Sequence, residues 1–91
     1  MTTKCFKLIV NGRVQGVGFR YGTNQIANRL GITGSVRNLP DGTVEIIAEG
    51  AADILDSFIE LIKQGPTSFA RVTNVQITEL PIHHYRLFMI K

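Results

Sequence analysis

The first third of the chain changes from a two-residue to a helical spacing of apolar side chains. Residues 5–10 alternate, with Phe6, Leu8 and Val10 on one face, which predicts a strand that Gly12 interrupts. From residue 19 onward, side chains recur at intervals that fit one face of a helix, and Gly31 provides a C-terminal stop. That predicted stripe consists of Phe19, Thr23, Ile26 and Leu30.

The middle of the chain predicts a hairpin followed by a second helix. Residues 35–37 and 43–49 have the composition of strands, and the intervening segment 38–42 contains Pro40 and an Asp-Gly turn. A second amphipathic helix then follows and ends at Gly65-Pro66. Its apolar face consists of Leu55, Phe58, Ile59 and Ile62.

The last third predicts two further strands, over residues 70–79 and 85–90. Val72 is out of phase with Val75, which indicates a β-bulge between them. The element order is therefore β-α-β-β-α-β plus a terminal strand. We expect a single α+β domain over residues 1–91, a ferredoxin-like βαββαβ sandwich in which an antiparallel sheet carries two helices on one face.

Length and composition narrow the classes of protein. The 91 residues carry a net charge of +3 with 44% hydrophobic side chains, so we expect one globular domain that favours anionic partners. No apolar run is long enough to cross a bilayer, and no signal-peptide core follows Met1, so we expect a soluble, cytoplasmic protein without a membrane partner. Cys5 is the single cysteine, which excludes an internal disulfide and a cysteine zinc site.

Residues 12–20 join the first strand to the first helix and are the strongest candidate for a ligand site. The loop contains Gly12, Gly16 and Gly18, so its N–H groups can turn inward to form an anion-binding nest beside a helix N-terminus. Arg20 can grip two phosphate oxygens with its planar guanidinium. The alternatives are a tight turn without a ligand and an exposed helix arginine; the Walker A and G-x-G-x-x-G spacings are absent.

Asn38 is the second candidate, because topology places it near that loop. In a split βαβ unit the first two strands are parallel with one strand between them, so the loop and the end of the second strand are separated by roughly 10 Å. An Asn amide can hold a water molecule in line with phosphorus, although it is not a useful base. The alternative is that Asn38 caps the hairpin turn before Pro40.

Two segments, residues 12–20 and 34–45, closely resemble the acylphosphatase family in residues, order and separation. The resemblance extends over almost the whole chain and is weakest at residues 81–91. It implies hydrolysis of acyl phosphates, with Arg20 binding the phosphate and Asn38 orienting the attacking water. The phosphate-binding set that it implies is Gln15, Gly16, Val17, Gly18, Phe19 and Arg20.

The resemblance also implies small-molecule partners, namely an acyl phosphate and inorganic phosphate. A monomer is the default for a small enzyme whose sheet is covered on one face, and the alternative is pairing through exposed strand edges. The leaving carboxylate has a conjugate acid of pKa about 4, so it departs without a proton from the enzyme, and we expect neither a metal nor a cofactor. We discount His83-His84 as a surface loop. The roles of Arg13, Arg37, Arg71 and Tyr21, and the natural acyl group, stay open.

Two other functions compete with this interpretation. RNA-recognition domains share the topology, but the third strand carries two acids and no stacking aromatic, so we expect no nucleic-acid partner. A domain that binds carbamoyl phosphate or another acyl phosphate for a partner, as in hydrogenase-maturation carbamoyltransferases, would look similar. The chain ends at Lys91 without such further domains, which favours an independent enzyme.

Overall fold

A computed structural model describes residues 2–91 and contains the elements predicted from the sequence. Every predicted strand and helix is present, although most begin or end a few residues away from the expected positions. The elements are β1 (Thr3–Arg13), α1 (Phe19–Leu30), β2 (Thr33–Asn38), β3 (Val44–Ala51), α2 (Ala52–Gln64), β4 (Arg71–Leu80) and β5 (Phe88–Ile90). No helix within residues 2–91 is both long and apolar enough to span a membrane.

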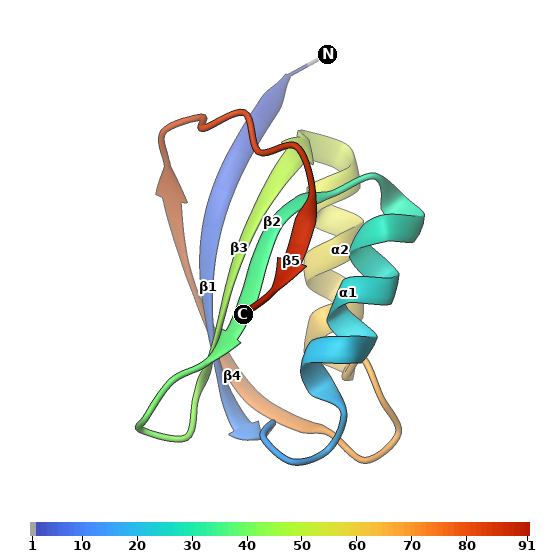
Figure 1. Ribbon diagram of the computed structural model, residues 1–91, viewed down its shortest axis with the longest axis vertical. Coiled ribbons are helices and arrows are strands. Elements are labelled where there is room, and N and C mark those ends of the chain that lie inside the picture. The colour runs from blue at the N-terminus through green and yellow to red at the C-terminus, as the bar shows by residue number, and fades with distance from the viewer. Residues whose placement is uncertain (1) are drawn as a thin grey trace.

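The strands form one sheet in the order β4-β1-β3-β2-β5, with both helices on the same face (Figure 1). This arrangement confirms the ferredoxin-like prediction, including the position of β3 between the parallel strands β1 and β2. The sheet is mixed rather than wholly antiparallel, because β5 pairs with β2 in parallel. The chain reverses after β4 and crosses to the other edge, so it arrives running in the direction of β1 and β2.

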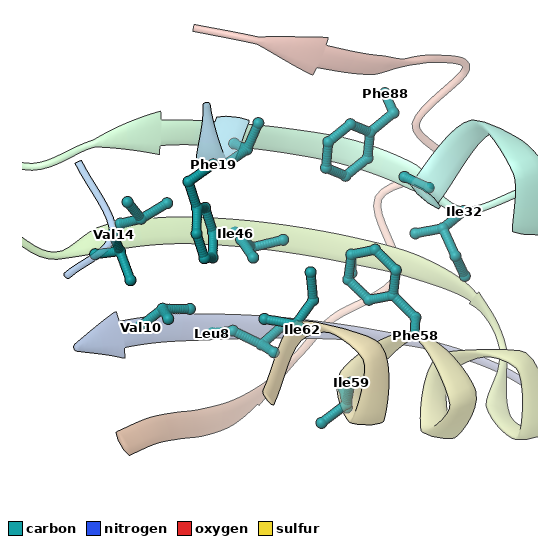
Figure 2. Close-up of a cluster of buried hydrophobic side chains, with 14 of the residues drawn as sticks. Leu8, Val10, Val14, Phe19, Ile32, Ile46, Phe58, Ile59, Ile62 and Phe88 are labelled. Atoms are coloured by element: carbon teal, nitrogen blue, oxygen red, sulfur yellow. The ribbon is translucent and has the colours of Figure 1, made fainter. Parts of the chain in front are cut away.

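The hydrophobic core fills the space between the helices and the sheet (Figure 2). Leu8 and Val10 are fully buried on the predicted face of β1, and the predicted stripe of α2 is buried throughout. The stripe of α1 differs: Ile26 and Leu30 are only partly buried, whereas Gly22 and Ala27 are buried. A Cβ at Gly22 would lie 2.7 Å from the Pro66 carbonyl oxygen, so the lack of a side chain at Gly22 allows the chain at Pro66 to approach α1 closely.

The predicted β-bulge lies in β4, where Asn11 pairs with Asn74 but Gly12 pairs with Val72. Thr73 is the extra residue, so the bulge confirms the phase change that the sequence shows between Val72 and Val75. Bulges bend a strand and increase its twist. Here the irregularity falls at the end of β1, directly before the loop to α1.

The last strand begins at Phe88 rather than Tyr85, because the buried Glu49 carboxylate binds the chain before it. The Glu49 Oε1 atom accepts the His83 N–H at 2.7 Å, and Oε2 accepts the Tyr85 N–H at 3.1 Å. His84, between them, has a φ of 66°, the left-handed conformation of a backbone nest. Both histidine side chains are exposed, as expected of a surface loop.

Candidate active site

The β1–α1 loop and the end of β2 meet at one end of the sheet, at the bottom of Figure 1. A cavity of about 250 Å³ lies between them. It brings together four of the predicted site residues from the loop and helix and the one predicted from β2, along with three apolar side chains. Its lining consists of Val14, Gly16, Gly18, Phe19, Arg20, Tyr21, Asn38 and Ile90.

The backbone of the loop has the alternating conformation of an anion-binding nest. Gly16 and Gly18 both have a φ of 75°, whereas the residues on either side of each are not in the positive region. This alternation points successive N–H groups toward one side, and glycine adopts it without a Cβ penalty. Within residues 2–91, none of the N–H groups from Gln15 to Gly18 donates a hydrogen bond. The loop therefore presents donors that the chain itself does not use.

The loop is held in place by two neighbouring segments. The Gln15 side chain lies away from the cavity, where its Nε2 donates to the carbonyl oxygens of Leu39 at 2.8 Å and Thr43 at 2.9 Å. On the other side, the Thr67 Oγ1 donates to the Val17 carbonyl oxygen at 2.9 Å. Sequence reasoning treated Gln15 only as a backbone donor and missed Thr67. A pairing over 24 or 28 residues leaves no periodic signal that could reveal it.

Arg20 lies in the first turn of α1 and is one of the cavity residues. Its Nη1 donates to the main-chain oxygen of Lys91 at 3.1 Å, which ties the guanidinium to the end of β5. In the described part of the chain, no Asp or Glu side chain forms an ion pair with it. The Lys91 oxygen occupies one donor of the guanidinium, and a phosphate can approach the remaining N–H donors.

Asn38 ends β2, where it pairs with Val44 of β3. The turn that follows is capped by Asp41, whose Oδ1 accepts the Thr43 N–H at 3.0 Å and the Thr43 hydroxyl at 2.7 Å. These two donors, the hydroxyl first, hold the pKa of Asp41 below its usual value. The capping role considered for Asn38 is thus taken by Asp41. Among the described residues, the buried Asn38 Oδ1 has no hydrogen-bond partner.

A buried amide oxygen without a partner is uncommon, since leaving such a group unsatisfied typically costs about 1–3 kcal/mol. The arrangement as a whole is a set of unused N–H donors, an arginine that pairs with no Asp or Glu side chain of residues 2–91, and an amide with unmet hydrogen-bonding capacity. These groups can bind a tetrahedral oxyanion and order a water molecule beside it.

Comparison with known proteins shows the family to which the chain belongs. The family model described as Acylphosphatase matches residues 6–90. The chain belongs to the acylphosphatase family. It is 48% identical over 87 residues to the acylphosphatase of Ligilactobacillus salivarius, a match that covers 96% of this chain and 97% of that protein.

Solved structures agree with the sequence comparison. The crystal structure of acylphosphatase from Bacillus subtilis superposes with a TM-score of 0.93 at 42% identity, covering 97% of this chain and 98% of that one. Full-length HypF in its phosphate- and nucleotide-bound form matches at a TM-score of 0.88 and 28% identity, covering 99% of this chain but 12% of HypF. The acylphosphatase fold is therefore shared both by whole small proteins and by one part of a larger one.

Two arginines outside the cavity have hydrogen-bond partners within the chain. Arg37 Nε pairs with Glu45 Oε1 at 2.9 Å, and Arg71 Nη1 donates to the carbonyl oxygens of Ser68 and Ala70. Neither these two arginines nor Arg13 lines the cavity. Gln15 and Val17 are also outside its lining, and the buried Phe19 side chain belongs to the core. Any contact of these three residues with phosphate would have to come from the main chain.

No group of three or more His, Cys, Asp or Glu side chains within residues 2–91 is arranged to hold a metal ion. Tyr21 is the one cavity residue whose place the sequence left undecided. It is 63% exposed and lies at the cavity instead of in the core.

Proposed function

We propose that this acylphosphatase hydrolyses acyl phosphates with Arg20 and the Gln15–Phe19 backbone binding the phosphoryl group and Asn38 orienting the attacking water. Acylphosphatase activity is what the family membership supports. The observation that carries the residue roles is the convergence of unused loop N–H groups, Arg20 and the unsatisfied Asn38 amide at one cavity.

The bonds that change require little from the protein. A water oxygen forms a bond to phosphorus, the bond from phosphorus to the acyl oxygen breaks with its electrons moving to that oxygen, and the products are a carboxylate and inorganic phosphate. The water proton leaves to a phosphate oxygen or to solvent. Because the carboxylate has a conjugate acid of pKa about 4, it departs unprotonated, and no residue has to act as a general acid.

Positioning and electrostatic stabilisation supply the acceleration in this proposal. In a loose phosphoryl-transfer transition state the charge is spread over the equatorial oxygens, where fixed N–H donors and a guanidinium stabilise it. Asn38 contributes orientation, because its amide accepts and donates hydrogen bonds but does not take up a proton at neutral pH. This division of roles explains how a site with one charged side chain in its lining supports hydrolysis.

The finer expectations belong to the same proposal. We expect the chain to act as a monomer in the cytoplasm on small acyl phosphates, without a nucleic-acid partner and without a metal or cofactor. The strand faces of β1 and β3 opposite the core support the exclusion of RNA, because Lys7, Ile9, Glu45 and Ile47 offer no aromatic ring for base stacking.

The test is steady-state hydrolysis of benzoyl phosphate together with inhibition by inorganic phosphate. Arg20→Gln is expected to abolish turnover and weaken phosphate binding, whereas Asn38→Ala abolishes turnover with a smaller loss of phosphate affinity. Arg29→Gln, an exposed arginine in the last turn of the same helix, is the matched control and leaves both quantities unchanged. Full hydrolysis by either site variant refutes the assigned roles.

The second candidate function is a domain that binds an acyl phosphate without hydrolysing it, which the similarity to one part of HypF brings into the test. Isothermal titration with inorganic phosphate separates the two functions when it accompanies the kinetic assay. Phosphate binding together with multiple turnovers supports the enzyme. Phosphate binding by the wild type with no turnover of benzoyl, acetyl or carbamoyl phosphate supports the binding domain.

A further inference from the structure

The cavity has a polar part, where we propose that the phosphoryl group binds, and an apolar part. The proposed phosphate chemistry does not use the apolar part. Val14, Phe19, Tyr21 and Ile90 make up the apolar part. Val14 and Phe19 are only 1% and 2% exposed, so their side chains belong to the core and offer a ligand little surface. Tyr21 is 63% exposed and Ile90 is 44% exposed, so these two side chains provide the apolar surface that a substrate can reach.

Tyr21 and Ile90 come from different elements that converge at Arg20. Tyr21 follows Arg20 in the first turn of α1, and its hydroxyl oxygen accepts a hydrogen bond from Gln25 Nε2 at 3.0 Å. Ile90 precedes Lys91, whose main-chain oxygen accepts the Arg20 Nη1 donor. Ile90 also pairs with Val36, two residues before Asn38 on the neighbouring strand. The two apolar side chains therefore adjoin both of the proposed catalytic residues.

We propose that Tyr21 and Ile90 form the binding surface for the acyl group, and that the enzyme favours acyl phosphates with an uncharged aromatic or branched apolar acyl group over acetyl phosphate. This inference rests on the proposed function, since it requires the phosphoryl group to lie at the loop and Arg20. With the phosphoryl group there, the acyl group extends toward the apolar part of the same cavity. Contact with a ring or branched chain removes exposed Tyr21 and Ile90 surface from water, and an acetyl group covers less of it.

The charge of the cavity supports an uncharged acyl group. Among the residues of its lining, Arg20 carries the single charge, and the phosphoryl group uses that charge. A second anionic group on the acyl portion would lie beside the apolar surface of Tyr21 and Ile90, which cannot pair with it, and this disfavours it.

The experiment compares benzoyl phosphate with acetyl phosphate in the wild type, Tyr21→Ala, Ile90→Ala and Tyr21→Phe. Each variant's kcat/KM is divided by the wild-type value for the same substrate, which cancels the intrinsic difference in reactivity. We expect Tyr21→Ala to lower kcat/KM about tenfold for benzoyl phosphate and less than about threefold for acetyl phosphate. Ile90→Ala lowers the preference for benzoyl phosphate over acetyl phosphate in the same direction. Tyr21→Phe has the wild-type preference, because it keeps the ring.

Inhibition by inorganic phosphate reports whether the polar part of the cavity is intact, and its constant should not change in any of these variants. Phe69→Ala is the control, because Phe69 is 72% exposed but lies outside the cavity lining; both substrates should be unaffected. Equal losses for the two substrates, or no loss in Tyr21→Ala and Ile90→Ala, overturn the inference. A wild-type protein that hydrolyses neither substrate contradicts the proposed function instead.

Discussion

The two ends of the sheet each contain a backbone nest, and they differ in what occupies it. The segment between β4 and β5 lies at the end shown uppermost in Figure 1. Within this segment, the N–H groups of His83 and Tyr85 donate to the buried carboxylate of Glu49. At the opposite end, the N–H groups of the loop around Gly16 and Gly18 have no acceptor within residues 2–91. The backbone conformation is similar in kind, with left-handed residues at His84 in the first nest and at Gly16 and Gly18 in the second.

This difference separates a structural nest from the nest that we propose binds phosphate. Glu49 supplies the anion from within the chain, so the nest fixes the crossover before β5 and has no capacity left for a ligand. The glycine loop has donors without an internal anion, and the cavity beside it carries Arg20. Of these two nests within residues 2–91, the glycine loop is therefore the one with N–H donors available to an anion from outside the chain. Mutations at the Glu49 nest should change stability, and mutations at the glycine nest should change phosphate binding and turnover.

The largest expected effect at the structural nest comes from Glu49→Gln. The amide keeps one acceptor oxygen but places an NH₂ group against the second backbone N–H, so we expect a loss of about 2–3 kcal/mol in the free energy of unfolding. Urea denaturation measures it. Glu45→Gln is the matched control on the same strand; its carboxylate pairs with the half-exposed Arg37, and we expect a loss of at most about 1 kcal/mol. A fall in kcat of the folded protein in Glu49→Gln would break the distinction between the nests.

The next effect comes from Gln15→Met, which keeps the side-chain length but removes both hydrogen bonds to the turn after Asn38. Without them the loop and Asn38 are no longer held at a fixed separation. We expect kcat to fall about 10- to 100-fold while inhibition by phosphate changes little, because the nest itself is intact. Gln76→Met on the exposed β4 is the control. A weaker phosphate affinity with unchanged kcat would show that Gln15 serves the nest rather than the position of Asn38.

A smaller effect comes from Gly16→Ala, for which Gly31→Ala is the matched control. Gly16 and Gly31 have φ values of 75° and 72°, and a Cβ at either position would meet nothing within 4 Å. Both substitutions should therefore destabilise the fold by about 1 kcal/mol through backbone strain alone. Only Gly16→Ala should also weaken phosphate binding, measured by isothermal titration. Equal phosphate affinities in the two variants would contradict a binding role for the loop.

The smallest effect is on the pH dependence of stability, through the thiol of Cys5 beside Glu49. Burial, and then the charge of Glu49, raises the pKa of Cys5 from 9.0 to about 11. Because the folded pKa is the higher one, the folded state binds more protons between these values, so this contribution to stability is complete below pH 9 and declines as pH rises to 11. Thermal denaturation from pH 8 to 11 should show a shallower decline in Cys5→Ala than in the wild type. Identical slopes would mean that the thiol does not titrate as described.

The fold was predictable because its signals are local and repeated. Alternation in β1, the apolar face of α2 and the phase change at Val72 each correspond to a feature of the structure. The parallel pairing of β5 was not predictable, because three residues at an edge carry no mark of their partner. The stripe of α1 was predicted correctly as the face toward the core, with Ile26 and Leu30 partly buried against it, but the burial of Gly22 was not predictable, since its close approach to Pro66 is a tertiary constraint.

The geometry of the candidate site was predictable where residue type and topology coincide. The glycine spacing indicated the nest, and strand order indicated that Asn38 lies near it; the structure brings Gly16, Gly18, Arg20 and Asn38 to one cavity. The hydrogen bonds of Gln15, Thr67 and the Lys91 main chain were not predictable, because each joins segments far apart in the sequence through a single side chain. These hydrogen bonds depend on the tertiary fold, which brings the segments together.

The most direct test of the difference between the two nests is a titration of the ¹⁵N-labelled protein with inorganic phosphate, followed by two-dimensional NMR. We predict that the amide signals of residues 15–20 and the side-chain amide of Asn38 shift and saturate together, while the amides of His83 and Tyr85 do not move. Saturable shifts at His83 and Tyr85, or a glycine loop whose amides do not respond to phosphate, would contradict the account.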